Sequence, residues 1–220
     1  PVMSRGLGDV YKRQGVGLVA STEGLKSRKV VEYGIDALKA VWHRGAIDAD
    51  GKTGDGAGIH IEIPKDFFEE KIEVTGHKHD NSELCVGMIF LPRNDYSAQE
   101  QCRTIVESEL TKRNFSIYGW RQVPVDPSVL GEKAEQTRPE ITQVLFTYND
   151  KKVVNKSLEQ KLYETRRVIE KEALNNQLNN FYICSFSSKS IIYKGMFLAE
   201  ALSDFYTDSV SYTHLRAHET

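Results

Sequence analysis

Long apolar runs are missing from this sequence of 220 residues, and so is a large excess of either charge. No stretch approaches the roughly 18 consecutive apolar residues of a membrane-spanning helix. No basic segment followed by an apolar stretch opens the chain, as it does in secretory signals. The formal net charge is only −2, from 29 basic and 31 acidic residues. We therefore expect no membrane partner, no nucleic-acid partner and a cytoplasmic location.

Cysteine is scarce as well, with Cys85, Cys102 and Cys184 far apart in the chain. Each is set within an apolar pattern, which favours reduced core thiols over a disulfide or zinc framework. None has a neighbouring histidine or a turn that would expose it as a nucleophile. His77 and His79 lie in a polar stretch without a second ligand cluster, which is typical of a solvated loop. We expect no metal site.

What the chain does have is a globular composition, with 40% hydrophobic and 27% charged residues. Its length suits one sizeable core and therefore one domain. The first fourteen residues and the last dozen, 209–220, lack a hydrophobic period that would bury a face. We expect residues 1–14 and 209–220 to be tails, and 15–208 to form the domain.

Between the tails, apolar segments alternate with amphipathic ones. Apolar or period-two patterns predict strands at 15–21, 57–63, 84–91, 115–125, 141–148, 181–186 and 191–196, with a polar loop over 126–140. Three- and four-residue spacings predict helices from Ser27 to about Trp42, over 98–110 and over 158–173, and Pro64 predicts a short helix through Phe68. The turn at 187–190 indicates that the last two strands pair with each other. This order favours an α+β fold, sheet on sheet with helices outside.

Residues 53–58, Thr-Gly-Asp-Gly-Ala-Gly, form a glycine-rich segment that leads into a predicted strand. Phosphate-binding loops instead follow a strand and open a helix, and they carry a Lys-Ser or Lys-Thr that is missing here. We interpret the segment as a tight turn that needs positive φ angles at several positions.

Three motifs occur in series, GVGLVAS at 15–21, WHRGA at 42–46 and TGDGAGI at 53–59. Their order and spacing resemble the start of the glutaminase domain of glutamate synthase large subunits, a class II glutamine amidotransferase. The resemblance covers residues 15–208. It implies a four-layer αββα sandwich of the N-terminal nucleophile hydrolase type, incomplete here. It also implies hydrolysis of L-glutamine to glutamate and ammonia, with the ammonia used to aminate 2-oxoglutarate in glutamate biosynthesis.

Gln14 stands where that family has its catalytic cysteine. There the cysteine is the first residue of the mature protein, so its thiol attacks the glutamine amide while its free α-amine acts as the base. An α-amine has a pKa of about 7.7–8.0, so a useful fraction is neutral near pH 7. Glutamine has no thiol, and residues 1–13 would block the amine even of a cysteine at position 14. We therefore expect no nucleophile in this chain.

A second part of the family's site lies beyond the position of Asp208. There the family supplies an arginine-containing strand, which binds glutamine, and an Asn-Gly pair, which forms the oxyanion hole. Nothing after Asp208 matches either. Because both the nucleophile and the oxyanion donors contribute strongly to catalysis, we expect the chain to be inactive.

The resemblance leaves Arg44 as the main substrate-binding residue. A planar guanidinium can donate two hydrogen bonds to a carboxylate or carbonyl group. The alternative is that His43 and Arg44 only cap the preceding helix, where basic side chains favour the negative end of the helix dipole. Gly15, Asp55 and Gly56 take a site-shaping role by the same resemblance.

For the parent enzyme the resemblance implies FMN, an iron–sulfur cluster and an electron donor, either NADPH or ferredoxin, with no cofactor in this chain. It implies as partners L-glutamine, the remaining synthase domains of the same polypeptide and a small electron-transfer subunit. The two tails resemble translated adaptor sequence joined to a gene fragment; natural disordered tails are the alternative. A second hypothesis is a non-catalytic scaffold or interaction module with the same fold.

Overall fold

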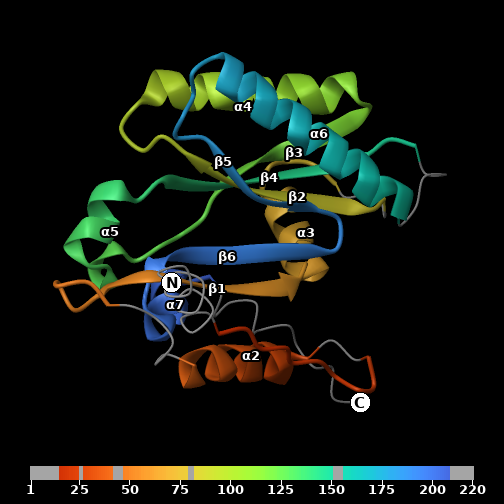
Figure 1. The fold of residues 1–220 in the computed structure, drawn as a ribbon. Coiled ribbons are helices and arrows are strands. Elements are labelled where there is room, and N and C mark those ends of the chain that lie inside the picture. Colours follow the sequence, from red (N-terminus) through yellow and green to blue (C-terminus); the bar gives the residue numbers. More distant parts are fainter. Residues whose placement is uncertain (1–14, 25–26, 42–46, 79–81, 151–155, 209–220) are drawn as a thin grey trace, which may run out of the picture. The chain divides into compact units, whose positions relative to one another are not determined.

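The computed structural model describes residues 15–24, 27–41, 47–78, 82–150 and 156–208 (Figure 1). Helices and strands alternate along the chain, and the strands of the larger sheet pair antiparallel, which confirms the α+β class. The chain divides into two compact units. Unit 1 consists of the described parts of Pro1–Ile59, Pro124–Thr137 and Tyr193–Thr220, and unit 2 of those of His60–Val123 and Arg138–Ile192. The predicted tails, 1–14 and 209–220, lie outside the described residues.

Unit 2 is built around a four-stranded antiparallel sheet in the order β3-β4-β2-β5. Its strands are β2 (Leu84–Leu91), β3 (Phe115–Gln122), β4 (Glu140–Tyr148) and β5 (Tyr182–Ser187). Helices α4 (Tyr96–Lys112) and α6 (Lys156–Asn175) cover one face, and α3 (Lys65–Val74) lies on the other (Figure 1). Successive side chains of a strand point to opposite faces, so the near-continuous apolar run of β2 serves both layers.

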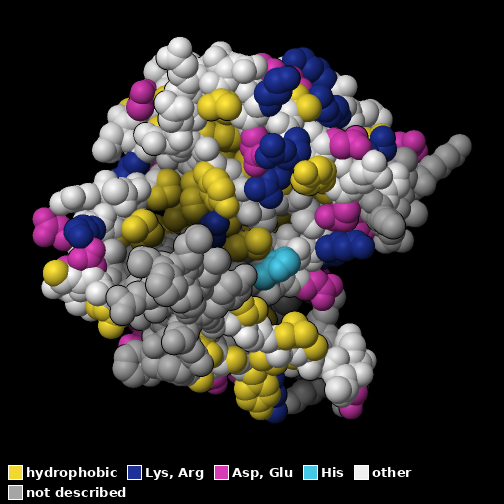
Figure 2. Space-filling model, viewed as in Figure 1, with side chains coloured by type: hydrophobic (Ala, Val, Ile, Leu, Met, Phe, Trp, Pro, Cys, Tyr) yellow, Lys and Arg dark blue, Asp and Glu magenta, His cyan; other side chains and the backbone are white. Residues whose placement is uncertain are grey.

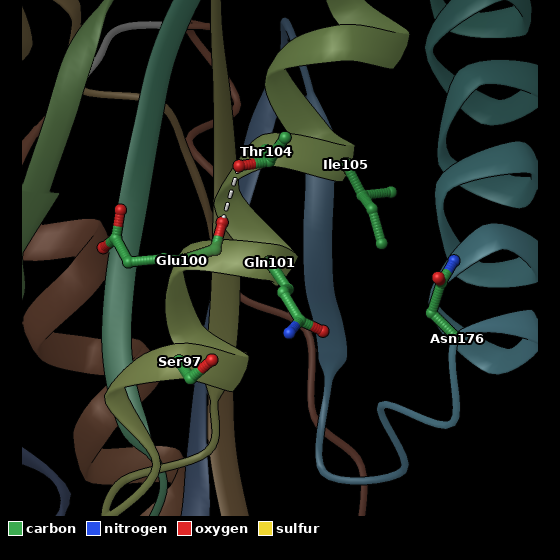
Figure 3. Close-up of a pocket in the computed structure, with 6 residues that line it drawn as sticks. All are labelled: Ser97, Glu100, Gln101, Thr104, Ile105 and Asn176. Carbon is green, nitrogen blue, oxygen red and sulfur yellow. Dashed lines mark hydrogen bonds between the residues drawn. The ribbon is translucent and has the colours of Figure 1, made fainter.

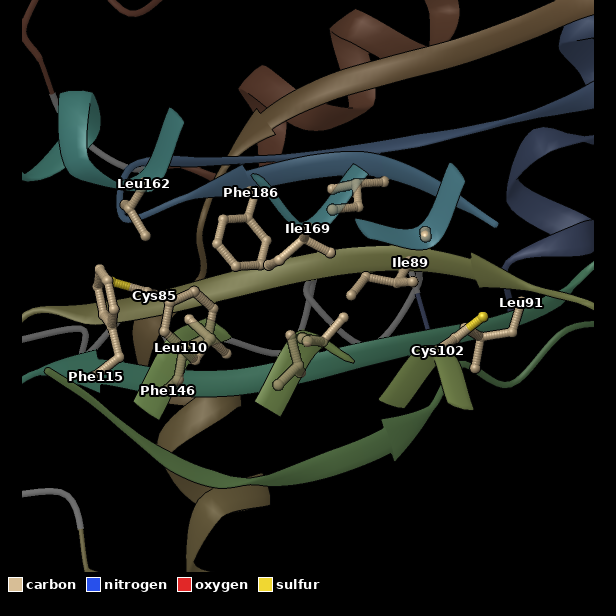
Figure 4. Close-up of a cluster of buried hydrophobic side chains, with 14 of the residues drawn as sticks. Cys85, Ile89, Leu91, Cys102, Leu110, Phe115, Phe146, Leu162, Ile169 and Phe186 are labelled. Carbon is tan, nitrogen blue, oxygen red and sulfur yellow. The ribbon is translucent and has the colours of Figure 1, made fainter. Parts of the chain in front are cut away.

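The core of unit 2 lies between the sheet and helices α4 and α6 (Figure 4). Its buried members include Cys85, Ile89 and Leu91 of β2, Val144 and Phe146 of β4, Cys102, Val106 and Leu110 of α4, and Leu158, Leu162 and Ile169 of α6. The ring of Phe146 lies 5.5 Å from that of Phe115 and 4.8 Å from that of Phe186, measured between centroids. The helical faces predicted from spacing are therefore the buried faces of α4 and α6.

Unit 1 combines short helices with a two-stranded sheet. Its elements are α2 (Arg28–Ala40), η2 (Pro127–Val129), α5 (Glu132–Thr137), η3 (Ala199–Ala201), α7 (Leu202–Phe205) and most of the strands β1 (Thr53–Glu62) and β6 (Ser190–Phe197), which pair with each other. Ser27 caps α2 as predicted, because its hydroxyl accepts a hydrogen bond from the Lys29 amide at 3.2 Å.

Four aromatic side chains form the centre of unit 1. Tyr193, Phe197, Phe205 and Tyr206 are each at most 2% exposed. Tyr206 contacts each of the other three rings, and Phe197 contacts Phe205, with ring centroids 4.8–6.2 Å apart. The Tyr206 hydroxyl donates to the Lys194 carbonyl at 2.8 Å, which satisfies a buried polar atom. The chain that follows β6 is thereby packed back onto it.

Two predicted strand features are wrong. Residues 15–21 form no strand. An extended segment becomes a strand only through a ladder partner, and unit 1 has its described strands in the β1–β6 pair. The side chains of Val16 and Leu18 are 95% and 92% exposed. The apolar run therefore predicted a strand, but none of the described strands pairs with this segment.

The hairpin predicted around residues 187–190 is also wrong, since β5 pairs with β2 and β6 pairs with β1. The turn is held by a helix instead. The Glu159 carboxylate of α6 accepts hydrogen bonds from the Ser188 amide at 2.8 Å and from the Ser187 hydroxyl at 2.9 Å. Ser187 Oγ in turn accepts from the Lys189 amide at 3.0 Å. The turn residues at 187–190 correctly predicted a bend in the chain. They did not predict that β5 would pair with β2 and β6 with β1.

Other differences concern lengths. The helix predicted from Pro64 to Phe68 continues to Val74 as α3, and the strand predicted over 115–125 ends at Gln122. The predicted polar loop over 126–140 contains η2 and α5, which are too short to show a hydrophobic period. Among the described residues, no helix combines the length and the apolar character needed to cross a membrane.

Candidate functional site

Gly15 lies against the C-terminal end of α2 in unit 1. A β-carbon built on Gly15 would lie 3.0 Å from Val41 Cβ and 3.1 Å from Val41 Cγ2, a separation tighter than ordinary side-chain contacts. Gly17 lies beside Ala37 in the same way, with 4.0 Å to its Cβ. The segment after position 14 therefore runs along α2 in the opposite direction. Gln14 and Arg44 themselves lie outside the described residues.

Asp55 and Gly56 are exposed and lie on β1, near its start. The tight turn predicted for 53–58 is wrong, because these residues belong to the strand and only Gly56 among them has a positive φ, at 125°. Instead, the absence of a side chain at glycine lets two backbone segments approach each other closely. A β-carbon on Gly54 would lie 2.7 Å from the Phe197 carbonyl oxygen. The segment is glycine-rich because β6 passes close to it.

The turn that precedes β1 is a tight hairpin loop over residues 48–53. The Asp48 amide donates to the Thr53 carbonyl at 2.9 Å, and the Gly51 amide donates to the Asp48 carbonyl at 3.0 Å. Gly51 has φ 71°, which glycine adopts without strain. The Asp50 carboxylate accepts from the Lys52 and Thr53 amides at 3.0 and 2.7 Å and from the Thr53 hydroxyl at 2.5 Å. These bonds, the one from the Thr53 hydroxyl first, hold the pKa of Asp50 well below its usual range.

A second segment of unit 1 contacts this loop. Gly131 is buried, and a β-carbon on it would lie 2.5 Å from the Thr53 amide nitrogen and closer still to Thr53 Oγ1 and Asp50 Oδ2. Lys133 Nζ donates to Asp48 Oδ2 at 2.6 Å. The hydrogen bond from Lys133 lowers the pKa of Asp48, and the same bond raises the pKa of Lys133. Residues about eighty positions apart in sequence are thus joined just before Asp55 and Gly56.

Sequence reasoning missed this arrangement. The Asp-Gly pair at positions 50 and 51 is a turn signal that points to the loop itself. Gly131 and Lys133 offer no comparable signal, because their partners are distant in the chain. The loop was therefore predictable from local sequence, and its contacts were not.

The cysteines match the prediction of reduced core thiols. All three are free and buried. Burial raises the pKa of Cys102 to about 11 and moves the pKa of Cys85 upward further. Cys184 Sγ donates to the Ile192 carbonyl at 3.5 Å. A thiol that stays protonated and buried is a poor nucleophile, so Cys85 and Cys102 are suited to packing in the core.

Within the described ranges, no three His, Cys, Asp or Glu side chains come together in a way that could hold a metal ion. The described residues therefore do not fit an iron–sulfur cluster, which needs several cysteine ligands side by side. His77, one half of the expected solvated pair, is exposed, and its Nδ1 lies 3.0 Å from the Thr75 hydroxyl. His79 lies outside the described residues.

Unit 2 has a shallow hollow of about 410 Å³ on its helical layer (Figure 3). It is lined by Ser97, Glu100, Gln101, Thr104 and Ile105 of α4 and by Asn176, which follows α6. The Thr104 hydroxyl donates to the Glu100 carbonyl at 2.8 Å, within the helix. The hollow holds none of the predicted site residues, so it is not a candidate for the amide chemistry.

Figure 2 shows charges of both signs on the face drawn, with hydrophobic side chains gathered in groups among them. On α6, for example, Arg166 Nε lies 2.8 Å from a Glu170 carboxylate oxygen. This mixed surface fits the small net charge of the sequence.

Comparison with known families shows which family the chain belongs to. The model of the class-II glutamine amidotransferases matches residues 14–217, and the chain belongs to that family. The match begins at position 14 and includes the three motifs that carried the resemblance.

Its relatives are glutamate synthases. The chain is 54% identical over 200 residues to the glutamate synthase (NADPH) large chain of Azospirillum brasilense, covering 91% of this chain and 13% of that protein. It is 36% identical over 195 residues to ferredoxin-dependent glutamate synthase 2 of Synechocystis, and 38% identical over 196 residues to ferredoxin-dependent glutamate synthase 1 of Arabidopsis thaliana. Each of these two matches covers 88% of this chain and 12% of the relative. The chain is thus a glutamine amidotransferase domain of the glutamate synthase type and spans about an eighth of the relatives' length.

Proposed function

We propose that this chain is the glutaminase domain of a glutamate synthase, whose complete form hydrolyses L-glutamine to glutamate and ammonia. The ammonia passes to another part of the same polypeptide, where 2-oxoglutarate is aminated and reduced to glutamate. One observation carries the proposal: the family match runs over 14–217 and so joins the nucleophile position to all three motifs. The higher identity to the NADPH-named relative, 54% against 36–38%, favours NADPH as the ultimate electron donor.

For the complete domain we propose the four-layer αββα sandwich. Support comes from unit 2, where α4 and α6 cover one face of an antiparallel sheet, and from the presence of a second sheet, β1–β6. The cofactors, FMN and an iron–sulfur cluster, belong in this proposal to the remaining synthase domains, together with any contact to a small electron-transfer subunit. A cytoplasmic location is part of the same proposal.

The glutamine site in this proposal lies where the segment after position 14 meets the end of α2. Gly15 touches Val41, and Arg44 follows Val41 by three residues. Three residues span at most about 11 Å, so the sequence keeps Arg44 within reach of position 14. We assign Arg44 to the substrate carboxylate and a shaping role to Gly15, Asp55 and Gly56. Arg44 is suited to that role because its guanidinium can donate two parallel hydrogen bonds to a carboxylate.

We further propose that the chain with Gln14 is inactive. A side-chain amide is not a nucleophile toward the glutamine amide, so the thioester intermediate of this class cannot form. The burial of all three thiols, and the raised pKa values of Cys85 and Cys102, support the proposal that none of them replaces it.

The test measures glutamate and ammonia released from L-glutamine. We expect no release above background from the chain with Gln14, nor from Gln14→Cys with residues 1–13 still attached, because the amine of position 14 stays in a peptide bond. Removing residues 1–13 from Gln14→Cys and adding the downstream sequence of the Azospirillum relative should produce turnover.

Two outcomes contradict the proposal. Turnover by the chain with Gln14 places the active site elsewhere. No turnover by the restored and folded protein favours the alternative, a non-catalytic scaffold with the same fold.

A further inference from the structure

We propose that Gly131 and Lys133 form a clamp that positions the hairpin loop 48–53 and, through it, the site-shaping residues Asp55 and Gly56. Both clamp residues and the loop belong to unit 1. The inference rests on the proposed function, because the glutamine site is what gives the position of Asp55 and Gly56 its importance. Gly131 and Lys133 are positioning residues in this scheme and touch no substrate.

Hydrogen bonds within the loop close it. Asp50 collects three hydrogen bonds from Lys52 and Thr53, and the loop closes through the Asp48 amide and the Thr53 carbonyl. Asp48 and Thr53 are flanked by the bridge between Ile47 and Gly54. These bonds fix the shape of the loop. Its place in the unit requires a contact from outside the loop.

Gly131 supplies the steric part of that contact. Thr53 is only 3% exposed, and the neighbouring Leu130 and Ala134 are 9% and 4% exposed, so this edge of the loop faces protein. The bare Cα of Gly131 lies where any β-carbon would collide with the Thr53 amide and the Asp50 carboxylate. The Asp50 carboxylate and Thr53 are hydrogen-bonded to each other, so they cannot move apart without breaking those bonds. Only glycine lets the two segments approach this closely.

Lys133 supplies the electrostatic part. Its ammonium group bonds the Asp48 carboxylate at the other end of the loop, so the clamp has two points of attachment. The Lys133 side chain is 67% exposed, and solvent weakens such a pair. We therefore expect the glycine contact to dominate and the ion pair to contribute less.

The consequence for the site follows from chain connectivity. Asp55 comes two residues after Thr53, and the strand between them is already held against Phe197 by the close approach at Gly54. A loop displaced at Thr53 would move the start of β1, and Asp55 and Gly56 with it. A displacement of about 1 Å in such a site is enough to reduce activity about a hundredfold.

Amide hydrogen exchange tests the clamp in the full chain without requiring catalysis. In Gly131→Ala we expect the amides of Asp48, Gly51, Lys52 and Thr53 to exchange at least about tenfold faster, because the added methyl group forces the loop away. In Lys133→Met the increase should be smaller, about two- to threefold. Lys133→Arg should restore the original rates, since it can also bond Asp48.

Gly34→Ala is the matched control, because its β-carbon would meet only the Ile59 side chain, at 3.4 Å. It should leave exchange in the loop unchanged. Amides of β2 and β4 in unit 2 report whether each variant is folded. If Gly131→Ala does not fold, the comparison of loop exchange in Lys133→Met and Lys133→Arg tests the clamp without it. Unchanged loop exchange in Lys133→Met, or in a folded Gly131→Ala, overturns the clamp.

A second readout uses the restored protein with a processed Cys at position 14. There Lys133→Met should raise KM for L-glutamine several-fold with a smaller change in kcat, and Lys133→Arg should reverse it. Equal KM values in all three proteins overturn the positioning role. Complete inactivity of the restored parent counts against the proposed function, and the exchange result then judges the clamp by itself.

Discussion

The two units of this chain contrast in how they bury their helices. In unit 2, α6 sets Leu158, Leu162 and Ile169 into the core with no exposed surface. In unit 1, α2 has the same three- and four-residue spacing of apolar side chains, yet none of its thirteen residues is buried. The same pattern therefore has two outcomes. Spacing decides which face of a helix is apolar, and neighbouring elements decide how far that face is covered.

The units also differ in how their strands come together. Unit 2 relies on large side chains, each fully buried aliphatic one contributing about 1.5–3 kcal/mol relative to exposure. In unit 1 the absence of side chains also matters, since a β-carbon on Gly54, Gly58 or Gly131 would collide with backbone atoms of a neighbouring segment. A β-carbon on Gly87 of unit 2 would instead meet the side chains of Phe186 and Val144. We therefore expect unit 2 to be sensitive to deletions in its core and unit 1 to be sensitive to additions at glycine.

The largest expected effect comes from deleting a side chain at the centre of unit 2. Phe146 is fully buried and contacts the rings of Phe115 and Phe186. Phe146→Ala should lower the free energy of unfolding by about 3–5 kcal/mol, because it removes apolar contact and leaves a cavity. Urea denaturation measures this. Tyr163→Ala, at a side chain that is 63% exposed, is the control and should change stability by less than about 0.5 kcal/mol.

An addition in unit 1 should have the next largest effect. In Gly54→Ala the new methyl group would lie 2.7 Å from the Phe197 carbonyl oxygen, and backbone atoms cannot rotate away as a side chain can. We expect a loss of about 1–3 kcal/mol and faster amide exchange along β1 and β6. Gly17→Ala, with 4.0 Å to the Ala37 β-carbon, should be nearly neutral. Equal stability of the two variants would contradict the close approach of β1 and β6.

A smaller effect is expected at the turn that joins the two sheets of the chain. Glu159→Ala removes the acceptor for the Ser187 hydroxyl and for the Ser188 amide and hydroxyl. Leaving partly buried donors without an acceptor costs about 1–3 kcal/mol, and we expect a loss at the lower end. Glu164→Ala, at an exposed position of the same helix, is the control. A loss no greater than that of Glu164→Ala would show that the turn holds without the helix.

The smallest expected signal is the absence of thiol reactivity in the folded chain. A thiolate forms only as the pH approaches the thiol pKa, and burial raises that of Cys102 to about 11. Iodoacetamide at pH 8 should therefore leave Cys85, Cys102 and Cys184 unlabelled in the folded state and should label all three in urea. Rapid labelling of Cys102 without urea would show that the core of unit 2 opens readily, which would weaken the contrast between the units.

Several elements of unit 2 were predictable from sequence because each signal is local. The strand at 84–91 has the predicted bounds, and the predicted faces of α4 and α6 are buried. The failures share one cause. The segment 15–21, the supposed hairpin at 187–190 and the supposed turn at 53–58 each depend on a partner that is distant in sequence. Hydrophobic period and turn residues carry no information about that partner.

The candidate site shows the same division. Motifs in series identified the family. Gln14 predicts a missing nucleophile, because chemistry of this kind depends on residue type at a position. Gly15 against Val41 and Gly131 against Thr53 were not predictable, because a glycine that permits close approach looks the same in sequence as one that bends the chain.

The sequence by itself therefore determined the α+β class, the family and the faces of the long helices, and it predicts the loss of the thiol at position 14. These follow from residue identity and from periods of two to four residues. Tertiary structure alone decided that β6 pairs with β1, that Glu159 holds the turn between β5 and β6, and that residues 131–133 meet the loop before β1. The physical reason is that such contacts are chosen by competition among distant segments, each of which satisfies its backbone and fills its space only when the others are in place.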